Sequence, residues 1–179
     1  MFKRRHFLSF AGALASAFTL ALSTAPAAYA LEAGQAAPAF NLPGQDGKNV
    51  SLANFRGRYV YVDFWASWCG PCKQSFPWMN TLQSKLGPSG LQVLAINVDE
   101  KAADANHFLT AVPASFTVLF DAKGSAPAAY DVQGMPTSFL VGPDGKVLFV
   151  HKGFKDSDRA ELEQKIGALI ASKPAEVKP

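Results

Sequence analysis

The chain has 179 residues, of which 49% are hydrophobic and 17% are charged, so it can build one globular domain with a full apolar core. Its formal net charge of +3 comes from three basic residues at the start, Lys3 to Arg5. Removing these three from the 17 basic residues leaves 14, which equals the 14 acidic residues. This balance argues against a basic surface for nucleic acid and against nucleic acid as a partner.

The first 30 residues have the pattern of an export signal. The basic start is followed by an apolar stretch rich in Ala and Leu over 7–22. Residues 28–30 read Ala-Tyr-Ala, the small-x-small pattern that signal peptidase cleaves after, so we expect cleavage near Ala30. The mature protein would then be soluble and exported, for example to the bacterial periplasm, which is an oxidising compartment.

The same segment leaves the route and the cleavage open. Residues 4–8, Arg-Arg-His-Phe-Leu, resemble the twin-arginine export consensus, although Lys3 stands where Ser or Thr is usual. Residues 7–28 could instead stay as an uncleaved membrane anchor. Ser16 and Pro26 interrupt this apolar stretch, which disfavours a stable membrane span.

Turn signals separate the elements that follow the leader. Asp46-Gly47 lies between two segments that alternate with period two, 40–42 and 50–52, and predicts a small β-hairpin. Residues 59–65 form a continuous aromatic and β-branched run, which is typical of a central buried strand. A helix is expected after it, continuing from about Cys72 to Leu86.

The rest of the chain alternates between strand and helix patterns. We expect a strand over 91–98, a helix over 104–112, a strand over 116–120, a short helix over 126–130, strands over 137–141 and 146–151, and a C-terminal helix after Asp158. Asp158 and Glu161 have the spacing of a capping box. This order predicts an α/β fold, a mixed central sheet with helices on both faces, in one domain over 31–173 with a frayed tail over 174–179.

Cys69 and Cys72 are the only two cysteines, and two residues separate them. A disulfide that only stabilises the fold normally closes a long loop, because a long loop loses more entropy in the unfolded state. A pair this close is better suited to opening and closing. Two alternatives stay open: a structural disulfide, and half of a zinc site that would recruit His107, His151 or acids, for which the spacing gives no support.

The segment around the cysteines carries a family resemblance. Residues 62–73, Val-Asp-Phe-Trp-Ala-Ser-Trp-Cys-Gly-Pro-Cys-Lys, resemble the active-site segment of thioredoxin, and Pro77 matches its helix-kinking proline. Residues 134–137, Gly-Met-Pro-Thr, match its cis-proline loop. Residues 37–40 together with 46–48, and residues 129–132, resemble the exported TlpA/ResA-like branch of the thioredoxin superfamily.

The resemblance covers about 35–175 and implies a thioredoxin fold with an N-terminal β-hairpin extension. It implies a cis peptide bond before Pro136, which would lie against the cysteines and leave the backbone of Met135 free to pair with an extended client segment. Gly153 would lie near the same groove. The expected client-binding residues are Trp68, Gly70, Pro71, Met135 and Thr137.

Disulfide exchange needs a thiolate that attacks and a second thiol that resolves the mixed disulfide. Cys69 lies where the strand meets the helix, so the helix N-terminus favours its thiolate. Cys72, one turn further along, is expected to be more buried and to resolve. The Gly70-Pro71 pair between them resembles that of reducing dithiols. The redox-active pair is itself the reactive group, and we expect no other cofactor and no metal.

Asp63 is an acid inside an apolar strand, six positions before Cys69. Loss of solvation would raise its pKa, so it could take a proton from Cys72 through water and return it. The alternative is that it points outward at a strand end. Two positions depart from the resemblance: Ser75 stands where ResA-like proteins usually have glutamate, and Ala95 stands where thioredoxin has a lysine.

These residues predict an exported thiol–disulfide oxidoreductase, acting as a monomer, that reduces disulfides of envelope proteins. Its clients would be apocytochromes c, copper-site proteins or proteins of general redox homeostasis. With two cysteines it needs an electron donor, by resemblance a membrane thiol transporter. One alternative is a thiol peroxidase of the redoxin group, although the Pro-x-x-x-Thr-x-x-Cys setting is missing. The other is a Cu(I)-delivery module that uses the two thiols and Met135.

Overall fold

The computed structural model describes residues 31–172. The predicted export signal with its cleavage site, the alternative anchor over 7–28 and the tail over 174–179 lie outside the described residues. Within 31–172, no helix combines the length and the apolar character that crossing a membrane requires.

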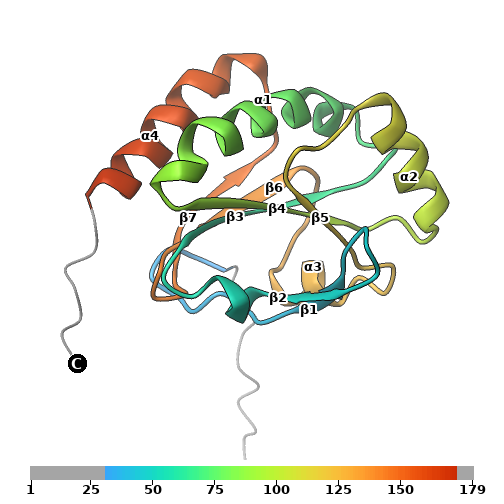
Figure 1. Ribbon diagram of the computed structural model, residues 1–179, viewed down its shortest axis with the longest axis horizontal. Coiled ribbons are helices and arrows are strands. Elements are labelled where there is room, and N and C mark those ends of the chain that lie inside the picture. Colours follow the sequence, from blue (N-terminus) through green and yellow to red (C-terminus); the bar gives the residue numbers. More distant parts are fainter. Residues whose placement is uncertain (1–30, 173–179) are drawn as a thin grey trace, which may run out of the picture.

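A five-stranded mixed sheet forms the centre of the fold (Figure 1). Its strands are β3 (Tyr59–Trp65), β4 (Leu91–Asn97), β5 (Thr117–Phe120), β6 (Thr137–Val141) and β7 (Val147–Lys152). Their spatial order is β5-β4-β3-β6-β7, in which β3, β4 and β5 are parallel while β6 pairs antiparallel with both β3 and β7. The continuous apolar run of β3 therefore lies at the centre, where all of its residues are buried, as its sequence predicts.

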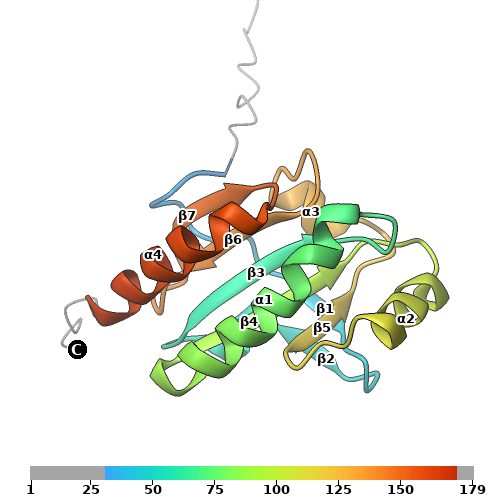
Figure 2. The same cartoon turned by 90° about the horizontal axis from the view of Figure 1, so that it is seen from above.

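Helices cover both faces of this sheet. They are α1 (Gly70–Leu86), α2 (Ala102–Ala111), α3 (Ser125–Ala129) and α4 (Arg159–Ala171), with 3-10 turns η1 (Leu52–Phe55), η2 (Gly87–Ser89) and η3 (Asp156–Asp158). One face carries α1 and α4, and the other carries α3 and the hairpin of β1 (Asn41–Pro43) and β2 (Asn49–Ser51) (Figures 1 and 2). The predicted α/β architecture with a hairpin extension is confirmed.

Alternation along β3 divides the apolar core in two. Tyr61 and Trp65 belong to the core beneath α1 and α4, whereas Val62 and Phe64 belong to the core on the hairpin side. Because side chains of a strand alternate between faces, Asp63 shares the α1 face with Tyr61 and Trp65. Its side chain is only 1% exposed, so the alternative of an outward-pointing acid is wrong.

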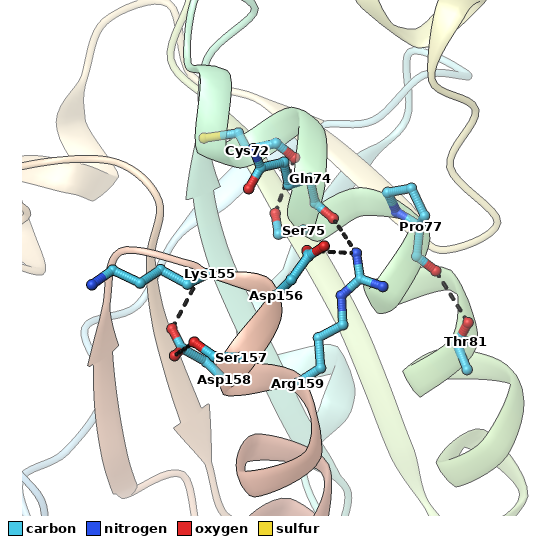
Figure 3. A network of polar contacts seen from close by, with 10 residues as sticks. All are labelled: Cys72, Gln74, Ser75, Pro77, Thr81, Lys155, Asp156, Ser157, Asp158 and Arg159. Atoms are coloured by element: carbon cyan, nitrogen blue, oxygen red, sulfur yellow. Dashed lines mark hydrogen bonds and ion pairs between the residues drawn. The ribbon is translucent and has the colours of Figure 1, made fainter.

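The predicted elements agree with the structure to within two residues at each end, but the predicted capping box of α4 is wrong. The carboxylate of Asp158 accepts hydrogen bonds from the N–H of Lys155 and from the hydroxyl of Ser157, both at 3.0 Å (Figure 3). It makes no side-chain cap on α4. Asp158 therefore caps the preceding turn η3, since both of its carboxylate oxygens accept hydrogen bonds there.

Phe76 of α1 is packed against three aromatic rings of the α1 core, and we expect its truncation to be costly. Its ring is fully buried, with centroids 4.7 Å from Trp65, 5.0 Å from Phe108 and 5.3 Å from Phe116. Phe76→Ala leaves a cavity and should lower the free energy of unfolding by about 3–5 kcal/mol in a denaturant titration. The control is Trp68→Ala, at a side chain 72% exposed, which should change it by less than about 1 kcal/mol. Equal effects would contradict this packing.

Candidate active site

Cys69 and Cys72 meet at the junction between β3 and α1, where they form a disulfide. Cys69 is the N-cap of α1, and its Sγ accepts a hydrogen bond of 3.2 Å from the backbone N–H of Cys72. Pro71 fits the first helical turn, where its missing N–H leaves no bond unmade. Cys69 is 5% exposed and Cys72 is fully buried, so only the sulfur predicted to attack lies toward the surface.

Exposed residues surround Cys69. Trp68 is 72% exposed and borders a groove of about 340 Å³, which Lys73 of α1 and His107 of α2 also line. Gly70 and Pro71 are exposed as well, and a Cβ at Gly70 would meet nothing within 4 Å. The structure thus places three of the predicted client-binding residues on the open surface beside the disulfide.

A second groove, of about 330 Å³, lies along the proline loop. Its lining includes Met135, Pro136 and Gly153, so Gly153 lies beside the proline loop. The Met135–Pro136 bond is cis, as expected. Met135 packs against the core cluster that contains both cysteines. Thr137 is only 3% exposed and its hydroxyl donates to the carbonyl of Gly134 at 2.6 Å, so its side chain stabilises the loop and faces away from a client.

Asp63 is a buried acid with one hydrogen bond. The hydroxyl of Ser138 on β6 donates to its Oδ1 at 2.6 Å, and its Oδ2 has no hydrogen-bond partner among residues 31–172. Burial raises the pKa of Asp63 to about 7, although the hydrogen bond from Ser138 opposes that rise. Burial and the neighbouring Asp63 charge also raise the pKa of Tyr61 well above its ordinary value. Asp63 can therefore exchange a proton near neutral pH.

The two positions that depart from the resemblance contribute no charge. Ala95 of β4 lies directly opposite Asp63 in the sheet register, as the sequence predicts. Ser75 is buried in α1, and its hydroxyl donates to the carbonyl of Cys72 at 3.0 Å (Figure 3). That hydroxyl is used within the helix that carries the cysteines.

The start of α4 is tied to the helix that carries the cysteines. Pro77 lies inside α1 and provides no N–H. The guanidinium of Arg159 donates to the carbonyl of Gln74 at 3.5 Å and pairs with Asp156 at 2.9 Å (Figure 3). This contact holds α4 against the first turns of α1.

Asp99 is a site residue that the sequence reasoning missed. It is 5% exposed at the end of β4, and its carboxylate accepts from the N–H of Ser67 at 3.0 Å and from the Ser67 hydroxyl at 3.1 Å. The side-chain amide of Asn97 donates to it at 2.8 Å. These bonds hold the loop that leads into Trp68 and Cys69. The available signal was an acid at the end of a buried apolar run.

The family model described as Redoxin matches residues 32–166. The chain belongs to the redoxin family. It is 36% identical over 120 residues to the thiol-disulfide oxidoreductase ResA of Bacillus subtilis, and the matched region covers 67% of each protein. It is 34% identical over 131 residues to the ResA of Bacillus thuringiensis, 73% of this chain and 76% of that one.

Solved structures agree with this family. A Chlorobium tepidum protein named for the thiol:disulfide interchange protein DsbE is 55% identical, with a TM-score of 0.76 over 78% of this chain and 99% of that one. A Neisseria meningitidis protein named for thioredoxin is 30% identical, with a TM-score of 0.68 over 78% of this chain and 93% of that one. The predicted thioredoxin fold is confirmed, and the chain is a thiol–disulfide oxidoreductase with Cys69 and Cys72 as its redox-active pair.

Asp63 should make stability depend on pH. Its pKa of about 7 in the folded protein lies above the ordinary value of 3.8, so the folded state holds a proton that the unfolded state releases. The stabilising contribution is complete below about pH 4 and is lost as pH rises through about 7. Relative to Asp63→Asn, the free energy of unfolding of the oxidised protein should therefore fall by about 4 kcal/mol between pH 4 and pH 8. Parallel stability curves for the two proteins would contradict this.

Proposed function

We propose that this oxidoreductase works in the reducing direction on disulfides of exported proteins. The observation that carries the proposal is the asymmetry of the pair: Cys69 caps α1 at the surface, Cys72 lies buried behind it, and Asp63 is a buried acid with a pKa of about 7. The helix N-terminus stabilises a Cys69 thiolate, which makes that sulfur the attacking group. The uncharged Gly70-Pro71 pair is the feature that favours reduction.

The reaction runs in two exchanges. The Cys69 thiolate attacks one sulfur of the client disulfide, which forms a mixed disulfide and releases the other client sulfur as a thiolate. Cys72 then gives its proton to Asp63 and attacks Cys69. The second client sulfur leaves, so the client gains two electrons and the Cys69–Cys72 disulfide forms. Asp63 returns a proton when the pair is reduced again.

Regeneration requires a partner. Cys69 and Cys72 are the only cysteines, so no third thiol of this chain can reduce the oxidised pair. An external dithiol must reduce it, and a membrane thiol transporter is the proposed donor. No bound cofactor takes part in this cycle.

The client would lie along the groove at Trp68 and along the groove of the proline loop. Trp68, Gly70 and Pro71 form one contact surface, and an extended client segment would pair with the backbone of Met135 on the other side, next to Pro136. Thr137 stabilises the proline loop through the hydrogen bond from its hydroxyl to the carbonyl of Gly134.

We propose that the leader directs export with cleavage near Ala30, and that the protein acts as a monomer in an envelope compartment such as the periplasm. In such a compartment thiols are normally oxidised to disulfides, so clients that need free thiols must be reduced there. Thiol proteins that must receive haem or copper are the client class proposed.

The attacking cysteine can be identified by trapping. Cys72→Ala cannot resolve the mixed disulfide, so it should accumulate client adducts that are seen on non-reducing gels and are released by dithiothreitol. Insulin serves as a model client, and the wild-type protein should turn it over when a dithiol is supplied.

Cys69→Ala is the matched control, because it keeps Cys72 and removes the sulfur that is predicted to attack. It should trap no more than a variant without cysteines. Adducts that form only with Cys69→Ala would reverse the assignment of the two sulfurs, and absent turnover of insulin by the wild type would count against reduction.

A further inference from the structure

Asp63 belongs to a row of side chains that crosses the sheet. In the strand register Ala95 of β4 lies opposite Asp63, Ser138 of β6 lies on its other side, and His151 of β7 follows Ser138. Directly opposite residues of paired strands share one face, with Cβ atoms about 5 Å apart. Ser138 is thus held beside Asp63 by the sheet itself, and it is 2% exposed.

The contact between Ser138 and Asp63 is directional. The hydroxyl donates to Oδ1 at 2.6 Å, whereas Oδ2 has no partner within residues 31–172. A buried carboxylate with one oxygen bonded and the other free has a fixed orientation and a single atom available for a proton. The core that encloses it contains Cys72, so the available proton donor lies on the same face.

We propose that Ser138 is the positioning residue of the proton relay: its hydroxyl holds Oδ1 of Asp63 so that Oδ2 takes the proton of Cys72 and returns it. The inference rests on the proposed role of Asp63 as that relay. Ser138 touches neither sulfur nor client in this scheme, and it acts through the carboxylate. It supplies from β6 the stabilisation that a cation at position 95 would have supplied from β4.

The other groups that face Asp63 do not stabilise its ionised form. Tyr61, on the same face of β3, has a raised pKa and stays neutral. Ala95 on β4 has no charge, and Cys72 on α1 is the proton donor. His151 on β7, beyond Ser138, has a pKa lowered first by burial. The charged groups around it are on the α4 side, namely Asp158, Glu161 and Lys165.

Removal of the hydroxyl should therefore raise the pKa of Asp63. A hydrogen bond to a charged group corresponds to about one pKa unit or more, so in Ser138→Ala the ionised fraction at pH 7 should fall from about one half to about one tenth. Resolution of a preformed mixed disulfide by Cys72 should slow about fivefold at pH 7 and recover above pH 9. If Ser138 only packed the core, Ser138→Ala would change the rate of resolution without shifting its pH dependence.

The test combines two readouts on the full protein, the pH profile of mixed-disulfide resolution and the carboxyl carbon titration of Asp63 by NMR. Ser138→Thr and Ser138→Val have matched shapes and differ in the hydroxyl, so Thr should keep the wild-type profile and Val should shift it like Ala. This pair keeps the test valid if Ser138→Ala folds poorly. His151→Asn, the next side chain in the row, should leave both readouts unchanged.

The outcomes separate the inference from the function that it rests on. If Asp63→Asn leaves the pH profile unchanged, Asp63 is not the relay, and the proposed proton transfer fails. Suppose that Asp63→Asn abolishes the transition near pH 7, but the pH profile of Ser138→Val is the same as that of the wild-type protein. Only the role of Ser138 is then overturned. An equal shift in His151→Asn would also overturn it. The expected result is a shift by Ser138→Val that disappears when Asp63→Asn is present.

Discussion

The active site depends on one junction, where β3 ends at Trp65 and α1 begins at Gly70. A helix start leaves backbone N–H groups without partners, and here the sulfur of Cys69 accepts one of them, that of Cys72. The same geometry places Cys72 inside the core and Trp68 outside it. The difference between the two sulfurs, and the surface on which a client can lie, follow from the position of this one cap.

The second constraint is the burial of a carboxylate beneath that junction. Asp63 loses solvation on the central strand, and the only hydrogen bond to its carboxylate within residues 31–172 comes from Ser138. Such a group destabilises the fold near neutral pH, since an apolar residue would pack there without the desolvation cost. The Asp63 carboxylate can accept a proton, and the resolving thiol must lose a proton before it attacks.

Much of the fold could be predicted because its signals are local. The apolar run of β3, the Gly-Pro stop after Leu86 and the turn at Asp46-Gly47 identify elements without knowledge of their neighbours. Ser138 could not be predicted as a site residue, because its partner Asp63 lies 75 positions away and meets it only through strand pairing. Asp99 was missed for the same reason, since it acts on a loop 32 positions earlier. The error at Asp158 arose where two turns compete for one carboxylate.

The central claim is that the Cys69–Cys72 pair delivers electrons to clients. The measurement that tests it most directly is the reduction potential of the pair, obtained by equilibrating the protein with defined dithiol and disulfide mixtures and quantifying both forms. The account predicts a potential below the glutathione range, that is, more negative than about −260 mV. A potential near about −120 mV, typical of a strong oxidant, would contradict it.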